Sequence, residues 1–218
     1  MYNDRYDAGE KLAELLAEYK GKENRIIAIP NGGVPVGASL VRKLGGKLSL
    51  LIVRKLQIPY NPEAGFGAVT MDGTVIFNKR ILSYINLTRH QVDQIISKTR
   101  AEIYDRMQFY HIDYSNLRKE ISNKTVILTD DGLASGFTMI AAIKSIKNYE
   151  PDKIIVAVPT TPKTSFDLVS NYADQVISSD IKDVRIFSVA SAYKNWYDLD
   201  KDEVLNIINE LKAENLFF

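Results

Sequence analysis

The stretch Val126-Ile-Leu-Thr-Asp-Asp-Gly-Leu-Ala-Ser-Gly-Phe-Thr-Met139 decides the fold of this chain. Its first residues, Val126 to Leu128, are apolar and largely β-branched, which is typical of a buried parallel strand. Two adjacent carboxylates, Asp130 and Asp131, follow where this strand should end. Burying two like charges side by side costs several kcal/mol unless something compensates them. We therefore expect the pair at the open carboxyl edge of a sheet, where ligands bind.

A loop of small and hydroxylated residues follows the acids, and a helix follows the loop. The glycines let the backbone turn and direct its N–H groups inward, and Ser135 and Thr138 add hydroxyl donors. An apolar pattern with helical spacing begins at Met139. A phosphate here would meet free N–H groups and the positive end of a helix dipole. The segment thus predicts a site for a phosphorylated sugar, with the acids holding its hydroxyls or a hydrated Mg²⁺.

Two other readings of this segment remain open. One is a buried strand, a solvated turn and a helix capped by Thr138, which would leave the acidic pair and the two hydroxyls without a role. The other is a phospho-acceptor receiver domain, which also has acids at strand ends. That reading fits less well, because the pair lies past mid-chain and leads directly into an anion-binding turn.

The segment resembles the phosphoribosyl-diphosphate (PRPP) motif of type I phosphoribosyltransferases. That motif consists of an apolar strand, two acids, two or three linking residues, Thr/Ser-Gly-x-Thr and a helix. The resemblance implies that Asp130 and Asp131 hold the ribose 2′- and 3′-hydroxyls and take part in Mg²⁺ binding. It implies that the 5′-phosphate binds at the loop formed by Gly132, Ala134, Ser135, Gly136, Phe137 and Thr138.

A second glycine loop, Pro30-Asn-Gly-Gly-Val-Pro-Val-Gly37, lies between a predicted strand and a predicted helix. Adjacent glycines can bring bare backbone close to a ligand at a helix start, although a plain tight turn would use the same residues. Beside the first motif, this loop resembles the pyrophosphate loop of the family, with Asn31, Gly32 and Gly33 at the diphosphate. The family often has a basic residue where Asn31 stands. Its absence here argues against a direct charge contribution from this loop.

The basic pair Arg54-Lys55 follows the predicted strand 48–53 and opens a stretch rich in Pro, Gly and Asn. Such pairs are usually solvated. At the carboxyl end of a strand, however, they could neutralise a departing diphosphate and so act in catalysis. Residues around this pair closely resemble a bacterial and archaeal branch of uncharacterised phosphoribosyltransferases. The resemblance extends over nearly the whole chain, through Pro59, Asn61, Pro62, Glu63 and Gly67 as well as Asp4, Arg5, Asp7, Ala8, Gly9, Glu102, Arg106, Tyr110, Tyr193, Asp202, Glu203 and Val204.

Periodicity predicts an α/β fold with a mostly parallel sheet flanked by helices, and the resemblance adds a small flap or hood subdomain. Helices are expected over 8–19, 34–44, 88–110, 163–171 and 202–212 and after Thr138. Strands are expected over 25–29, 48–53, 67–71, 74–77, 126–128, 154–158, 175–178 and 184–189, with loop over 111–123. We expect one domain over 1–218, with a flexible flap at about 54–90 and a variable C-terminal part at about 184–218.

Composition excludes several classes of protein. The 218 residues carry 28 Lys and Arg against 27 Asp and Glu, so no basic excess indicates nucleic-acid binding. The absence of cysteine excludes disulfides and thiolate metal sites and fits a reducing cytoplasm. No apolar run approaches membrane-spanning length, and the N-terminus is too polar for a signal peptide. We therefore expect a cytoplasmic protein without membrane or nucleic-acid partners.

Three further groups of residues are ambiguous. Glu102, Asp105 and Arg106 could form ion pairs on a wet helix face, or Arg106 could reach the active site or a dimer partner. His90 and His111 have no metal-ligand partner at suitable spacing and are expected to be structural. The aromatic residues Tyr193, Trp196 and Tyr197 could stack on a base, pack in the core or form a dimer contact.

The resemblance implies a phosphoribosyltransferase of nucleotide metabolism, a glycosyltransferase acting on PRPP with Mg²⁺. It would pass the phosphoribosyl group to an acceptor, usually a nitrogenous base, and release diphosphate. Enzymes that salvage 6-oxopurines generally carry an acid where Ala134 stands, which argues against hypoxanthine and guanine. The alternative is a non-catalytic PRPP- or nucleotide-binding regulatory protein of the same fold. Related enzymes are often dimers, so a homodimer is expected.

Overall fold

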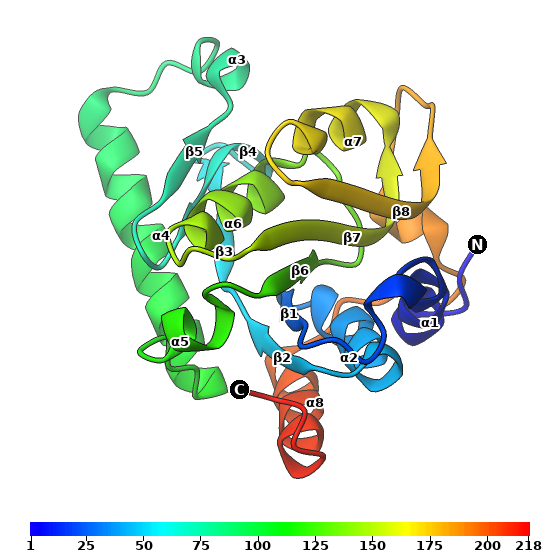
Figure 1. The fold of residues 1–218 in the computed structure, drawn as a ribbon. Coiled ribbons are helices and arrows are strands. Elements are labelled where there is room, and N and C mark those ends of the chain that lie inside the picture. The colour runs from blue at the N-terminus through cyan, green and yellow to red at the C-terminus, as the bar shows by residue number, and fades with distance from the viewer.

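The computed structural model describes residues 1–218 apart from the side chains at positions 62 and 63. The resemblance noted at Pro62 and Glu63 therefore lies outside the described residues. In the described part, a parallel sheet has the strand order β2-β1-β6-β7-β8 (Figure 1). These strands are β1 (Arg25–Ala28), β2 (Lys47–Leu50), β6 (Thr125–Thr129), β7 (Lys153–Pro162) and β8 (Gln175–Lys182). The predicted α/β class is confirmed.

Alternate strand residues face opposite sides of this sheet and build two cores. Ile26, Ile127 and Ile155 face the helices α1 (Arg5–Leu15), α2 (Gly33–Leu44) and α8 (Lys201–Ala213). Ile27 and Leu128 belong to the other core, which the helices α6 (Phe137–Lys147) and α7 (Lys163–Ser170) cover. Figure 1 shows the sheet between these two layers. Because both faces are covered, the strands read as continuous apolar runs.

A second, antiparallel sheet contains β3 (Val53–Ile58), β4 (Asn61–Thr70) and β5 (Val75–Phe77). The helix α3 (Lys79–Leu82) follows it, and the long helix α4 (Arg89–Tyr110) runs alongside it (Figure 1). A capping box of Thr88 and Gln91 is present at the start of α4, where a helix was predicted to begin. The carboxylate of Asp72 ties this sheet to α6, because it accepts hydrogen bonds from Ser145 and Asn148.

Several predicted elements are wrong or incomplete. The stretch after Arg54, where no strand was predicted before residue 67, is a hairpin of β3 and β4, and register shifts near Gln57 obscure its alternation. The strand expected over 48–53 divides, because the chain leaves the parallel sheet after Leu50 and enters the second sheet at Val53. The helix expected over 8–19 begins at Arg5 and ends as α1 at Leu15, before the short turn η1 (Ala17–Tyr19).

Two further differences lie later in the chain. The loop expected over 111–123 contains the short helix α5 (Leu117–Ile121). The strand expected over 184–189 is absent from the described residues, where β8 instead continues to Lys182 and the turn η2 (Val189–Ala192) follows. Val184 and Ile186 are 48% and 93% exposed, because they follow β8, which forms the edge of the described sheet. No helix in the described residues is long and apolar enough to span a membrane.

Candidate active site at the carboxyl edge of the sheet

The strand order reverses between β1 and β6, and this is where the two predicted loops meet. β2 lies on one side of β1 and β6 on the other, and all three strands are parallel. Ligands of such open α/β sheets bind outside the carboxyl ends of the strands at this switch point. The loop after β1 carries Asn31 to Gly33, and the segment after β6 carries the acid pair. The topology alone therefore brings both predicted motifs to one place.

The two loops touch through glycine backbone. A Cβ atom added at Gly32 would lie 1.9 Å from Oδ2 of Asp131. One added at Gly33 would lie 2.9 Å from the carbonyl oxygen of Thr129. Only residues without a side chain permit this approach, so the pair of glycines is required for packing against the acids. The peptide bond between Pro30 and Asn31 is cis.

The acid pair is electrostatically strained. Burial and the neighbouring charge of Asp131 raise the pKa of Asp130 well above its ordinary value. Burial also raises the pKa of Asp131, although the Arg5 guanidinium opposes this shift. Oδ1 of Asp130 accepts a hydrogen bond from the backbone N–H of Asp131 at 2.8 Å. Two carboxylates this close favour a bound proton or a cation at neutral pH.

Arg5 provides the counter-charge for this pair. Its Nε donates to Oδ2 of Asp131 at 2.9 Å, and the two side chains are only 7% and 15% exposed. Its Nη1 donates to the carbonyl oxygen of Tyr197 at 2.9 Å, and its guanidinium lies 4.0 Å from the centre of the Trp196 ring. Sequence reasoning noted Arg5 only as part of the resemblance and assigned it no role at the site.

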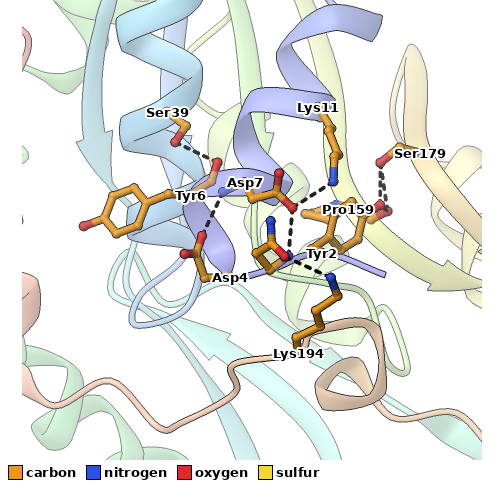
Figure 2. A network of polar contacts seen from close by, with 10 residues as sticks. Tyr2, Asp4, Tyr6, Asp7, Lys11, Ser39, Pro159, Ser179 and Lys194 are labelled. Carbon is orange, nitrogen blue, oxygen red and sulfur yellow. Dashed lines mark hydrogen bonds and ion pairs between the residues drawn. The ribbon is translucent and has the colours of Figure 1, made fainter.

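Polar contacts hold the segment that carries Arg5 (Figure 2). The hydroxyl of Tyr2 donates to the carbonyl oxygen of Pro159 at 2.8 Å. The carboxylate of Asp4 caps α1 by accepting from the backbone N–H of Asp7 at 2.9 Å, and Ser39 on α2 donates to the carbonyl oxygen of Tyr6 at 3.1 Å. Asp4 thus marks the helix start, and this cap was the local signal that could have placed Arg5 in the first turn of a helix.

The late aromatic residues pack around Arg5. Tyr193 is buried, and its hydroxyl donates to the carbonyl oxygen of Asp131 at 2.6 Å. Burial, followed by the charge of Asp131, raises the pKa of Tyr193. Trp196 contacts both Arg5 and the Tyr193 ring, whose centre lies 5.4 Å away. Core packing is therefore what the structure shows for Tyr193 and Trp196, while Tyr197 is 52% exposed.

The predicted phosphate loop lies open between β6 and α6. Ala134 and Ser135 are exposed, and Phe137 and Thr138 are half-buried at the start of α6. Gly136 is the residue before the helix and has a left-handed φ of 80°. A Cβ atom there would lie 2.9 Å from Cγ2 of Val169. The helix thus begins at Phe137, two residues before the apolar pattern that starts at Met139, and its first N–H groups have no partner within the helix.

The second sheet and α4 bring two arginines, Arg54 and Arg106, to the neighbourhood of Asn31. Arg106 on α4 donates from Nη1 to Oδ1 of Asn31 at 3.0 Å, and the hydroxyl of Tyr110 donates to the same oxygen at 3.2 Å. Arg54 lies on β3 and pairs with Glu102 at 3.3 Å. Among the described residues, Arg106 therefore forms no ion pair with an acid of its own helix. Lys55 is exposed, and as the next residue of a strand it points away from the direction of Arg54.

The carboxylate oxygens at this edge suit a hard cation that takes its remaining ligands from substrate and water. No cluster of three or more His, Cys, Asp or Glu that could hold a metal occurs among the described residues, and both histidines are exposed. Two carboxylates beside the loop predicted to bind phosphate fit Mg²⁺, which takes most of its ligands from substrate oxygens and water. A cavity of about 420 Å³ between α5 and the C-terminal segment is lined by neither acid of the pair and by no residue of the two glycine loops.

Comparisons with known proteins agree with this geometry. Residues 3–195 match the family model described as "Phosphoribosyl transferase domain". The Mycobacterium tuberculosis proteins named "Putative phosphoribosyl transferase" Rv0571c and MT0597 are each 30% identical over 209 residues, which is 96% of this chain but 46% of theirs. The chain thus spans about half the length of these curated relatives.

Among solved structures, TT1426 from Thermus thermophilus superposes with a TM-score of 0.74 at 27% identity. The superposition covers 96% of this chain and 98% of that protein. The match to the family model covers most of the chain and includes both loops and the acid pair. The chain therefore belongs to the phosphoribosyl transferase domain family.

Proposed function

We propose that this protein is a phosphoribosyltransferase that takes PRPP with Mg²⁺, transfers the phosphoribosyl group to a nitrogenous base and releases diphosphate. The observation that carries this proposal is the contact between Gly32 and Asp131 at the switch point of the sheet. It places a bare backbone loop beside the two acids, and the start of α6 follows these acids after a short loop of the chain. Family membership supports the general activity.

Each part of the substrate has a matching group of residues in this proposal. The 5′-phosphate binds the loop from Ala134 to Thr138, where the first N–H groups of α6 and two hydroxyls can donate to it. Asp130 and Asp131 accept hydrogen bonds from the ribose hydroxyls, and the loop from Asn31 to Gly33 contacts the diphosphate. The reaction breaks the bond between C1 and a diphosphate oxygen and forms a bond from C1 to nitrogen. Positioning and charge stabilisation are the tasks of the protein.

Arg5 lets the acid pair act as acceptors in this scheme. A carboxylate has about four lone-pair sites, and Arg5 uses only one oxygen of Asp131. Its charge opposes protonation of Asp131, so at least one acid can stay ionised and accept from a hydroxyl. Mg²⁺ bound to the substrate would neutralise charge on the diphosphate, and Asp130 and Asp131 are the residues that would help to hold it.

The acceptor is the least constrained part of the proposal. Ala134 is exposed and carries no group that could exchange a proton with a purine, which disfavours hypoxanthine and guanine. The segment from Val184 to Val189 leads into the turn that contacts Gly132, since a Cβ atom there would lie 2.7 Å from Val189. We place the acceptor beside this segment. We also propose a homodimer, as in related enzymes.

The test is release of diphosphate from PRPP in the presence of Mg²⁺ and a panel of purine and pyrimidine bases. We expect release with one base and none when Asp130→Asn and Asp131→Asn are combined. PRPP binding without turnover on every base would favour the regulatory alternative. Failure of the wild-type protein to bind either PRPP or ribose 5-phosphate in calorimetry would refute both.

A further inference from the structure

We propose that Arg106, which reaches the site from α4, contacts the diphosphate directly and supplies the cation that the Asn31 loop lacks. This inference rests on the proposed function and adds a residue to it. It concerns the part of the loop at Asn31, which Arg106 and Tyr110 contact and where Arg54 is a charged neighbour of Arg106.

Asn31 itself is occupied by the protein at both ends of its amide. Its Oδ1 accepts from Arg106 and Tyr110, and its Nδ2 donates to the carbonyl oxygen of Leu199 at 2.7 Å. The amide is therefore a fixed connection between α4 and the segment before α8. Any positive charge at this loop must come from the side chains that surround Asn31.

Arg106 has the charge and the free donors for that task. It is half-buried, and its contact with Asn31 uses Nη1 alone among the hydrogen bonds found for it in the described part of the chain. In the same part of the chain it forms no ion pair, because Glu102 pairs with Arg54 instead. A guanidinium has further N–H donors in a fixed plane that matches phosphate oxygens.

The surroundings disfavour the cation until an anion arrives. Burial lowers the pKa of Arg106, and the neighbouring Arg54 lowers it further, against smaller opposing effects of Tyr110 and Glu102. Partly buried charges are normally paired, because an unpaired one carries an uncompensated desolvation cost. A bound diphosphate would offset this cost for Arg106, which in the described part of the chain has no ion-pair partner. The loop would then have acids on the ribose side at Gly32 and cations on the diphosphate side at Asn31.

Binding of two separate fragments tests the assignment. Calorimetry with magnesium diphosphate reports the Asn31 side, and calorimetry with ribose 5-phosphate reports the phosphate loop. We expect Arg106→Met to bind diphosphate about tenfold to hundredfold more weakly, from the loss of one or two charge-assisted bonds. Its affinity for ribose 5-phosphate should change by less than about threefold. Arg106→Lys should lie between Arg106→Met and the wild type, because it keeps the charge without the planar fork.

Two control variants separate charge from structure. Tyr110→Phe removes the other donor to Asn31 but keeps Arg106, so diphosphate affinity should stay close to that of the wild type. Arg100→Met removes an exposed arginine from the same helix and should have no effect. Unchanged diphosphate binding by Arg106→Met would overturn the inference while leaving the proposed function intact. If Arg106→Met loses affinity for both fragments equally, Arg106 has a structural role and the inference is overturned as well. The same follows if Tyr110→Phe weakens diphosphate binding as much as Arg106→Met does.

Discussion

Replacing Arg5 with methionine should destabilise the protein in a pH-dependent manner. The change removes the charge-assisted bond to Asp131, the bond to the carbonyl oxygen of Tyr197 and the contact with Trp196. The first is worth about 1.5–3 kcal/mol and a desolvated cation–π contact about 2 kcal/mol. Methionine regains part of the packing with Trp196. Removal of one partner from a buried pair generally costs about 3–5 kcal/mol, and we expect this range at pH 8.

The cost should shrink as the pH falls. Without Arg5, the two largest effects that oppose burial are lost, so the pKa of Asp131 rises further above its ordinary value of 3.8. A carboxyl with a raised pKa keeps its proton in the folded state at pH values where the unfolded chain has lost it. Stability therefore falls as pH rises from near 3.8 toward the raised pKa and then levels off. The difference between variant and wild type should be small at acidic pH and largest at pH 8.

Thermal unfolding between acidic pH and pH 8 measures this difference. A loss of about 3–5 kcal/mol corresponds to roughly 6–20 °C in Tm for a chain of this size. Combining Arg5→Met with Asp131→Asn should recover part of the loss, because the stranded carboxylate is gone. Lys11→Met breaks an exposed pair on the same helix and should leave Tm unchanged. A pH-independent deficit, or strictly additive effects of the two substitutions, would refute the role assigned to Arg5.

Three further variants have defined outcomes. Combining Asp130→Asn and Asp131→Asn should weaken PRPP binding at least about tenfold through loss of charge-assisted bonds, and unchanged affinity in calorimetry would count against the ribose assignment. Gly136→Val forces a β-branched residue to adopt a φ of 80° and to lie against Val169, so the variant should have a lower Tm. PRPP should no longer protect it against thermal unfolding. Normal protection would contradict phosphate binding at this loop. Asp72→Ala should speed amide hydrogen exchange in the turn between β4 and β5. Although burial opposes the shift, hydrogen bonds from Thr70, Thr74, Ser145 and Asn148 lower the pKa of Asp72. The stabilisation by Asp72 should therefore persist above about pH 4 and disappear on acidification. Equal hydrogen exchange in variant and wild type would show that the contact between Asp72 and α6 is dispensable.

The motif from Val126 to Thr138 could be predicted because its parts are local. The strand, the acids, the loop and the helix follow one another within a few residues, and each has its own pattern. The same holds for the capping box at Thr88. Segments that depend on a distant partner were harder to place. The β-branched residues around Ile186 have strand composition, but strand formation needs a neighbouring strand that the described sheet does not provide.

The contacts of Arg5 and Arg106 could not be predicted from pattern. Arg5 reaches an acid 126 positions away, and Arg106 reaches an amide 75 positions away. A periodic pattern identifies the face on which a side chain lies but not the partner that it meets. Glu102 lies four residues before Arg106 on the same helix, a spacing that allows an ion pair, yet Glu102 pairs with Arg54 on a strand instead. Such preferences depend on tertiary packing.

The bridge between Tyr2 and Tyr193 has a consequence for how the protein folds. Asp131 is covered by the beginning of the chain and by a segment 62 residues beyond it. Contacts between such widely separated segments form slowly, because the entropy cost of closing a long loop comes before the contacts stabilise the chain. On a ribosome, the mid-chain motif would emerge before the segment that completes its surroundings has been synthesised. Affinity for ligands at this edge should therefore arise as one of the last events of folding, well after the parallel sheet itself has formed.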